Sequence, residues 1–374
     1  MGKRELLLIA AFLAIGVVVY QVTAPPRQPG AEGFSIGRLV DEIRREIRGR
    51  PASAEVTMTV THPVAKGVSE LRVTMQNTPV TIVGEDRTDI ATELWVRSNG
   101  VDEAEAKSLA ERAELRVEPA GPTMTVSLRY PPEGSQRGRI RIQVPSAMLV
   151  QFGVTNAPIE ITGVGGVSLE SARGDTIVRQ VGGRVDVTHR GGEFTVEDAG
   201  TVRLTTRGSD LRLARVRGET ILLVQSGDVR ARELLGSVEI DATNADLIME
   251  ELQHAKGPFR ITAVDGEVTI RGLRAEARID GRGTDIDVTM ERPVPLAIFN
   301  TGGRIEVVPP LEGFTLDAQA TDGRLVVAEG LAIAVSTSAD GKEHRASGSV
   351  QGGGPTITVR ATRGEVRVSG REPD

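Results

Sequence analysis

The chain has 374 residues, a formal net charge of −6 and no cysteine, and only 3% of its residues are aromatic against 39% that are hydrophobic. The lack of cysteine excludes a disulfide framework, thiolate catalysis and cysteine metal sites, while the interspersed charges leave no basic surface for nucleic acid. The core must therefore consist mainly of Val, Leu, Ile and Ala, and the 43 glycines indicate many turns.

The N-terminal segment has the pattern of a membrane anchor. Lys3 and Arg4 precede an apolar run from Leu6 to Tyr20 that continues weakly to Val22, and about 17 residues of helix span roughly 26 Å, slightly less than the ~30 Å hydrocarbon layer of a bilayer. A signal peptide cleaved after Ala24 is the alternative, although two prolines follow directly and disfavour cleavage. We predict that residues 1–22 form a cytoplasmic stub and an uncleaved, single-pass signal anchor in the cytoplasmic membrane. The positive-inside rule then places all later residues in the periplasm or outside the cell.

Between this anchor and the first strands, the chain changes character twice. Residues 23–33 are rich in Pro and Gly and predict a linker. Residues 34–50 carry apolar side chains at helical spacing and arginines on the other faces, which predicts an amphipathic juxtamembrane helix. This helix either lies on anionic lipid or caps the open end of the domain that follows, and we favour the cap.

Residues 51–145 predict an N-terminal β region that is interrupted by one short helix. The helix extends from Asp102 to Ala113, with Asp102 as its N-cap and acidic residues in its first turn. The rest of the region alternates between apolar and polar residues, as short strands do.

Residues 146–330 carry a repeat whose step is 17 to 21 residues, with related units before and after it. The phrase "VRLTTRGSDLRL" at residue 202 recurs as "TILLVQSGDVRA" at 220, and a second apolar segment begins nine residues after the first. We number each unit from the first residue of its first apolar segment. The first and tenth positions are Leu71/Val80, Val150/Ile159, Val167/Thr176, Val185/Phe194, Val202/Leu211, Thr220/Val229, Val238/Leu247, Phe259/Val268, Ala277/Ile286, Leu296/Ile305, Leu316/Leu325 and Ile357/Val366.

Two architectures fit these units, whose third and twelfth positions are apolar and whose seventh or eighth position is Gly or Asn. One is an antiparallel meander of hairpins, and the other is a β-solenoid in which equivalent residues stack about 4.8 Å apart. We favour the solenoid because the columns persist through many units, insertions fall between units, and a thin core accommodates few aromatics. Ten coils would form a rod on the order of 48 Å long.

The predicted fold class is therefore all-β: a β-solenoid (β-helix) of 17–21-residue coils with short capping helices, preceded by one N-terminal transmembrane helix. We expect the helix at 34–50, together with the region 51–145, to cap one end. Residues 331–374 are expected to supply the C-terminal coil or cap and a tail. Weak caps would let rods associate end to end, which makes a self-assembling rod an alternative.

The chain also resembles a known bacterial family. The features that carry the resemblance are the signal anchor, the segment "ELRVTMQNTPVTIVGEDRTDI", a short acidic helix, and "SGDVRA"-like units that end in "ITVRATRGEVRV". They are similar to the putative-adhesin-like β-strand-repeat family, a domain of unknown function, over roughly residues 55–368. The resemblance implies an extracytoplasmic β-solenoid. Its motifs are structural, so it supplies no functional residue.

The sequence contains little recognisable chemistry. The four histidines, His62, His189, His254 and His344, are scattered without metal-ligand spacing, and we interpret them as surface residues. No hydrolase elbow, phosphate-binding loop or zinc-protease motif is present. We therefore predict no catalytic residue and no cofactor.

One polar column stands out at the ninth position of the units. Seven consecutive coils place a carboxylate there: Asp175, Glu193, Asp210, Asp228, Asp246, Glu267 and Asp285. Like charges about 4.8 Å apart repel by about 1 kcal/mol even in water-like surroundings, so a ladder of hard cations such as Ca²⁺ is one hypothesis for a metal site. The alternative, which we favour, is turn chemistry, in which the carboxylates accept backbone N–H groups and nearby Arg173, Arg207 and Arg282 screen them.

A β-helix enzyme that cleaves polysaccharides is the alternative function. Its carboxylates would come from Asp186, Glu239, Asp241 and Asp280. Only Glu239 and Asp241 are close in sequence, with Arg203 and Arg260 expected on the flanking coils, and aromatic sugar platforms are scarce. We therefore predict a non-catalytic, adhesin-like binding, scaffold or envelope-structural module whose ligand lies in the envelope or at the cell surface.

Overall fold

The computed structural model describes residues 52–153, 156–252 and 255–370. The predicted anchor, linker and amphipathic helix at residues 1–50 lie outside these ranges. Within them, no helix combines the length and the apolarity that a membrane crossing requires.

The described chain is almost entirely β-structure, with one α-helix and one 3₁₀ helix. The elements are β1 (Ala52–Pro63), β2 (Glu70–Thr74), β3 (Val80–Glu85), β4 (Asp89–Gly100), α3 (Glu103–Glu111), β5 (Glu114–Ala120), β6 (Thr123–Arg129), β7 (Ser135–Pro145), β8 (Leu149–Phe152), β9 (Ile159–Thr162), β10 (Gly166–Ala172), β11 (Thr176–Val216), β12 (Thr220–Leu234), β13 (Val238–Glu250), β14 (Phe259–Leu273), β15 (Ala277–Met290), β16 (Leu296–Val308), β17 (Phe314–Thr321), β18 (Arg324–Val327), η1 (Glu329–Leu331), β19 (Val335–Thr337), β20 (Glu343–Val350) and β21 (Thr356–Val368).

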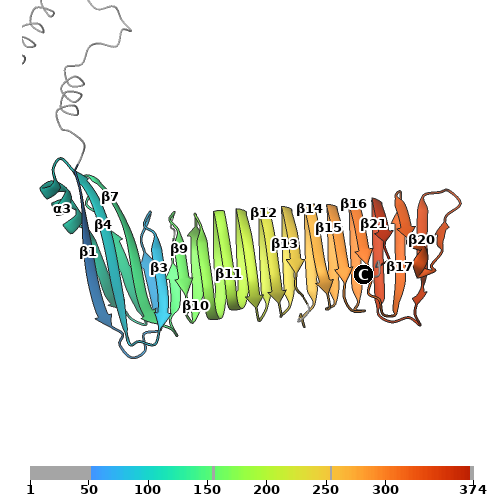
Figure 1. The fold of residues 1–374 in the computed structure, drawn as a ribbon, viewed down its shortest axis with the longest axis horizontal. Helices are drawn as coiled ribbons and strands as arrows, with labels where there is room; N and C mark the ends of the chain where they lie inside the picture. Colours follow the sequence, from blue (N-terminus) through green and yellow to red (C-terminus); the bar gives the residue numbers. More distant parts are fainter. Residues whose placement is uncertain (1–51, 154–155, 253–254, 371–374) are drawn as a thin grey trace, which may run out of the picture. The chain divides into compact units, whose positions relative to one another are not determined.

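The coils stack in parallel and in register, which confirms the solenoid-like arrangement and excludes the antiparallel meander for these units. β11 pairs with β12 so that Val202 lies beside Thr220 and Leu211 lies beside Val229. The same equivalence continues through β13, β14, β15 and β16, and Figure 1 shows these strands following one another in a row. Each coil therefore has two sides: positions one to six form the first side, and positions ten to thirteen form the second.

The inward positions of both sides form one apolar core. Leu204, Ile240 and Ile279, all at the third position, are at most 1% exposed. Among the described residues, Phe194 and Phe259 are among the largest fully buried side chains. Burying apolar surface stabilises a fold by about 25 cal/mol per Å², so the unbroken columns of aliphatic residues supply most of the stabilisation of the stacked coils.

The five coils that begin at residues 185, 202, 220, 238 and 259 turn at two corners where the backbone φ is positive. At the first corner, the seventh position, Gly208 has φ 63° and Asn244 has φ 51°, as their residue types predict. The second corner lies at the fourteenth position and has no such signal in the sequence, because most of its residues are not Gly or Asn. With φ between 52° and 58°, they are Gln180, Asp198, Arg215, Glu233 and Glu251.

Both ends of the solenoid are interleaved, so that the order of coils in space differs from their order in the chain. β2 lies between β6 and β8, and β3 lies between β7 and β9. At the other end, β21 pairs with β16 on one edge and with β17 and β18 on the other (Figure 1). Of the C-terminal coil or cap expected at residues 331–374, Thr356–Val368 form a coil that is internal to the row, while β19 (Val335–Thr337) and β20 (Glu343–Val350) belong to the antiparallel strands at this end. The apolar pattern of that coil fits any neighbouring coil, so it carried no information about its place.

Antiparallel strands close the two ends. β1 pairs with β4 and β4 with β7, while α3 packs against β1 and β4. The helix begins after Asp102, whose Oδ1 accepts a hydrogen bond from the backbone N–H of Glu105 at 2.8 Å, as the capping pattern predicts. At the opposite end, β17 pairs with β20 and β20 with β19. The cap expected at residues 34–50 lies outside the described residues and stays a prediction.

Candidate functional site

The ninth-position carboxylates lie at the first corner, where aspartates hydrogen-bond to the backbone of the next coil. The four bonds run from Glu193 N to Asp175 Oδ1 at 3.1 Å, from Asp228 N to Asp210 Oδ1 at 3.2 Å, from Glu267 N to Asp246 Oδ1 at 3.0 Å, and from Arg304 N to Asp285 Oδ1 at 2.8 Å. Each bond supplies a partner for an exposed corner N–H and so links two neighbouring coils. The aspartates thus have a structural task at every second coil.

The three remaining carboxylates of the column contact side chains of the second side. Glu193 forms an ion pair with Arg212, Asp228 lies 3.8 Å from Arg230, and Glu267 accepts a hydrogen bond from Thr269 at 2.9 Å. The arginines that pair with the column therefore come from the second side, and not from the expected Arg173, Arg207 and Arg282. The described residues contain no group of three or more His, Cys, Asp or Glu that could hold a metal ion. This geometry favours turn chemistry over a cation ladder.

Substitutions at Asp210 separate a hydrogen-bonding role of the column from a charge-based one. Asn keeps an oxygen acceptor for the N–H of Asp228 but removes the charge, so we expect Asp210→Asn to retain the wild-type melting temperature. Ala removes this acceptor and leaves the exposed N–H to water, so it should cost at most about 0.5–1.5 kcal/mol, the net value of one hydrogen bond. Thermal unfolding of both variants, with calcium and with a chelator, measures the difference. A calcium-dependent stabilisation that Asp210→Asn abolishes would support the cation ladder instead.

The carboxylates considered for an enzyme do not converge on one point. Asp186 and Asp280 are each bonded to the arginine two residues earlier in the chain. Glu239 and Asp241 project from the exposed first side of one coil. Arg260 lies beside Glu239 as expected, but the coil of Ile221 separates Glu239 from Arg203, so the expected flanking position of Arg203 is wrong.

His189 is wholly buried, so its interpretation as a surface residue is wrong. Its ring centroid lies 5.2 Å from that of Phe194, its Nδ1 lies 2.9 Å from Ser209 Oγ, and its Nε2 lies 2.9 Å from the carbonyl oxygen of Gly174. A carbonyl only accepts hydrogen bonds, so Nε2 carries the proton and Nδ1 accepts from the serine hydroxyl. Burial lowers the pKa of His189, against smaller opposing effects of the Gly174 carbonyl and the Asp175 charge.

The position of His189 in the repeat indicates that its side chain points inward. It occupies the fifth position of its coil, where the next coils have Thr206, Val224 and Ala242, all buried. The other histidines form no cluster with it. His62 and His344 are half-buried in the end regions, and His254 lies outside the described residues.

The folded protein is expected to lose stability as the pH falls below about 6.5, the ordinary pKa of histidine. In the unfolded chain His189 takes up a proton near this pH, whereas its lowered pKa delays protonation in the folded state. The contribution of His189 is therefore complete above about pH 6.5 and declines as the pH falls toward the folded-state pKa. Urea midpoints at about pH 7.5 and about pH 5.5 measure the loss, and His189→Gln should shrink the difference between them. An unchanged difference would assign the pH dependence to other groups.

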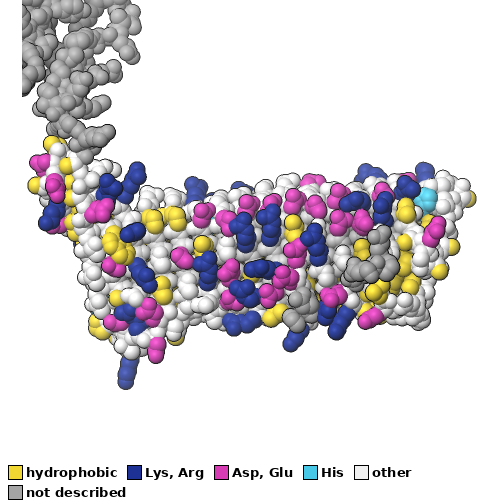
Figure 2. All heavy atoms as spheres, in the orientation of Figure 1, with side chains coloured by type: hydrophobic (Ala, Val, Ile, Leu, Met, Phe, Trp, Pro, Cys, Tyr) yellow, Lys and Arg dark blue, Asp and Glu magenta, His cyan; other side chains and the backbone are white. Residues whose placement is uncertain are grey.

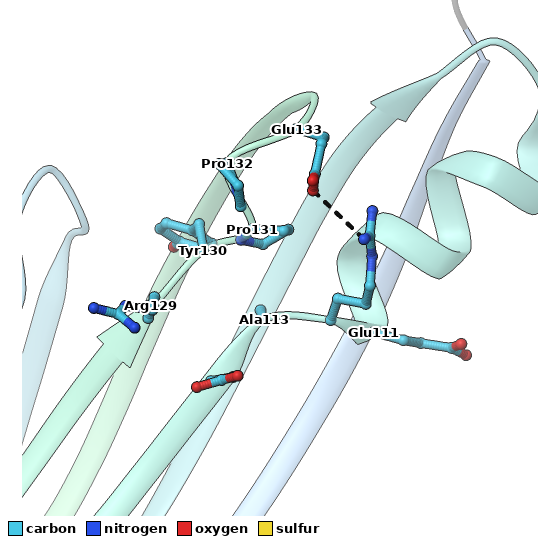
Figure 3. Close-up of a pocket in the computed structure, with 9 residues that line it drawn as sticks. Glu111, Ala113, Arg129, Tyr130, Pro131, Pro132 and Glu133 are labelled. Carbon is cyan, nitrogen blue, oxygen red and sulfur yellow. Dashed lines mark ion pairs between the residues drawn. The ribbon is translucent and has the colours of Figure 1, made fainter.

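One depression of about 450 Å³ lies beside the C-terminal end of α3. Figure 3 shows the segment Tyr130–Pro132 on one side and the end of the helix on the other, with Arg112 and Glu133 in an ion pair at 3.4 Å. Glu111 points away from this segment (Figure 3). The phenol of Tyr130 lies 3.2 Å from the hydroxyl of Thr78, and burial raises its pKa. The charged side chains here are paired or directed outward, so they do not converge on a ligand.

A second depression, also of about 450 Å³, lies on the first side of the solenoid and crosses four successive coils. We call it the coil-face depression, and its main side chains are Arg190, Arg207, Leu223, Gln225 and Asp241. Thr205 and Asp241 are the register neighbours of Leu223 on the two adjacent coils. Sequence reasoning missed this surface because its residues lie in four different units and form no motif within any one of them.

Several solved structures are similar to this chain. A putative cell adhesion protein from Clostridium sporogenes is 8% identical, with 86% of this chain and 100% of that chain covered and a TM-score of 0.18. A putative adhesin from Parabacteroides distasonis is 12% identical, with 68% of this chain and 97% of that chain covered and a TM-score of 0.36. A putative lipid binding protein from the same species is 12% identical, with 70% and 98% covered and a TM-score of 0.31.

The family comparison extends over most of the chain. No curated protein matches it, but the sequence model of a family described as Toastrack DUF4097 matches residues 68–369. This match begins at β2 and continues through β21, so it includes the complete row of parallel coils. The chain therefore belongs to the Toastrack DUF4097 family.

Proposed function

We propose that the protein is a non-catalytic, adhesin-like binding or scaffold module of the bacterial cell envelope. In this proposal, residues 1–22 anchor the chain in the cytoplasmic membrane and the solenoid lies in the periplasm or outside the cell. The observation that carries the proposal is the pairing of charged side chains between neighbouring coils. Arg179, for example, forms ion pairs with Glu160 at 3.0 Å and with Glu197 at 3.3 Å, one on each adjacent coil.

The pairing produces a regular surface instead of a reaction centre. Figure 2 shows Lys and Arg side chains interleaved with Asp and Glu along the stacked coils. Glycoside cleavage needs two carboxyl groups that face one bond about 5–10 Å apart, whereas the candidate carboxylates Asp186 and Asp280 are engaged by neighbouring arginines. A long surface with fixed spacing suits the binding of an extended ligand or the separation of two partners.

Protease accessibility tests the proposed location. Bacterial cells are first treated so that their outer layers become permeable while the cytoplasmic membrane stays intact. Added protease should then digest the solenoid of the full chain, while a cytoplasmic control protein survives. A chain that lacks residues 1–22 should stay in the cytoplasm and be protected. Protection of the full chain under the same conditions would contradict the proposed location.

Retention of envelope material tests the proposed role. The immobilised full chain should retain isolated surface polysaccharide or peptidoglycan, and the heat-unfolded chain should not. Turnover of a panel of acidic glycans is the contrasting measurement. Cleavage that Asp241→Asn abolishes would replace the binding role by the enzymatic one.

A further inference from the structure

The coil-face depression combines three kinds of contact in a fixed order along the stacked coils. Arg190 and Arg207 lie at the sixth position of two successive coils, Leu223 belongs to the next coil, and Asp241 belongs to the coil after that. Because successive coils are spaced by about 4.8 Å, the four coils span about 14 Å. The surface thus presents a cationic part, an apolar part and an acidic part in that sequence.

The two arginines at the cationic part are available for an outside ligand. Both side chains are exposed, and neither takes part in an ion pair within residues 52–153, 156–252 and 255–370. Arg212 and Arg215, which belong to the same coil as Arg207, are by contrast paired with Glu193 and Asp198. Gln225 Oε1 accepts a hydrogen bond from Arg207 Nε at 2.7 Å and so orients this guanidinium group. A guanidinium fork matches the geometry of carboxylate and phosphate groups.

The apolar and hydroxyl groups of the depression suit a ring with many hydroxyls. The side chain of Leu223 is 47% exposed, and of the large hydrophobic side chains exposed in the described ranges it alone lies in the row of parallel coils. Thr188, Thr205 and Thr243 add hydroxyl groups around it. Exposed Leu gives a C–H surface, and the hydroxyls exchange hydrogen bonds with a polar ligand.

The backbone geometry favours a glycan over a peptide. The depression lies on a side of the sheet, where the backbone groups of β11, β12 and β13 are already joined in parallel ladders. An extended peptide recognised by strand addition needs a free edge. A ligand can therefore contact only side chains here. Several of them carry hydroxyl groups, and two are arginines that form no ion pair among the described residues.

We propose that the coil-face depression binds an anionic polysaccharide. Arg190 and Arg207 contact its carboxylate or phosphate groups, and Leu223 contacts the C–H surface of a sugar ring. Asp241 accepts hydrogen bonds from its hydroxyls, and the threonines donate to them and accept from them. This inference rests on the proposed binding role and names the ligand class and the site for it. Without aromatic platforms, binding by one site is weak, and several sugar residues along the coils strengthen it.

Titration of the full chain with oligogalacturonate tests the site. Arg190→Gln together with Arg207→Gln should weaken binding by about a hundredfold, because each charged hydrogen bond contributes roughly a factor of ten or more. Leu223→Ala should weaken it by a smaller factor. Arg282→Gln is the matched control, since Arg282 is exposed at the same sixth position of a coil outside the depression. It should bind as the wild type does. The melting temperature of the double variant should stay unchanged because both side chains are exposed.

Further ligands decide between the possible occupants. A phosphorylated oligosaccharide in place of oligogalacturonate shows whether phosphate or carboxylate is preferred, and either result with dependence on the two arginines supports the site. Equal binding of a neutral maltooligosaccharide would overturn it, as would an equal loss in Arg282→Gln. Tighter, arginine-dependent binding of oligoglutamate would assign the surface to an acidic protein instead. Retention of envelope polysaccharide by the double variant at the wild-type level would reject this site and leave the proposed binding role intact.

Discussion

Gly227→Ala is expected to destabilise the solenoid by about 3–5 kcal/mol, far more than the same change one coil away. Gly227 has φ 116°, and an added Cβ would lie 2.2 Å from the carbonyl oxygen of Ser209 and 2.8 Å from its carbonyl carbon. Both atoms belong to the backbone of the adjacent coil, so they cannot rotate away as a flexible side chain can. The variant must either separate two stacked coils or distort the corner.

Gly208→Ala is the matched control for this prediction. Gly208 also sits at the first corner, but it has φ 63° and open space around the added Cβ. Its replacement should therefore cost only about 1–2 kcal/mol, which is the ordinary penalty of the left-handed conformation. The urea midpoints of both variants, followed by circular dichroism, measure the contrast. Equal losses would show that the coils are not held as closely at Gly227 as the backbone distances indicate.

The close approach at Gly227 belongs to an alternation at the eighth position of the coils. Added Cβ atoms at Gly266 and Gly303 would also lie 2.3 Å from a carbonyl oxygen of the preceding coil. The preceding coils have Ala245 and Thr284 there, both buried. Coils with a side chain at this corner therefore alternate with coils that have none, and the same pairs are joined by the aspartate bonds of the ninth position.

Val359→Asp is expected to detach the C-terminal end of the solenoid. Val359 is 0% exposed in β21, with Ile298 of β16 and Ala318 of β17 as its register neighbours. An unpaired carboxylate at this point costs several kcal/mol, which places the change among the most destabilising single substitutions. Because β21 holds β17 and β18 to the rest of the coils, all three strands should lose their protection together.

Hydrogen exchange with mass spectrometry measures this loss strand by strand. We expect fast exchange across residues 314–368 in Val359→Asp, while β12 to β15 stay protected. Thr362→Asp is the control, because Thr362 is exposed in the same strand and should tolerate the charge. Continued protection of β17 in a variant whose β21 exchanges rapidly would contradict the dependence of β17 on β21.

The stacking register could be predicted from the sequence because it depends on a local rule. Each coil repeats the same inward positions, so Val202 and Thr220 align in the chain as they do in space. The order of the end coils could not be predicted, since β2 and β21 have the same inward pattern as every other coil. Only pairing over long sequence separations decides which neighbours they contact.

The candidate site, too, is only partly predictable from the sequence. The acidic column follows from one position of the repeat, but its hydrogen bonds depend on which coil approaches its neighbour closely. His189 resembles a surface residue in the sequence because it is a single polar residue, and only its column, which is apolar in most coils, indicates that it is buried. The coil-face depression joins residues from four units, and the exposure of Leu223 becomes apparent only when those units are stacked.

Because β21 is inserted between strands that are synthesised before it, the chain cannot finish its solenoid one coil at a time. β16 and β17 leave the ribosome with exposed strand edges that have no partner until Thr356–Val368 follow. The row is thus complete only after Thr356–Val368 have been synthesised, and unpaired edges are sites where chains associate wrongly. The last coil also sets the length of the row, since no coil can be added after β16 without displacing β21.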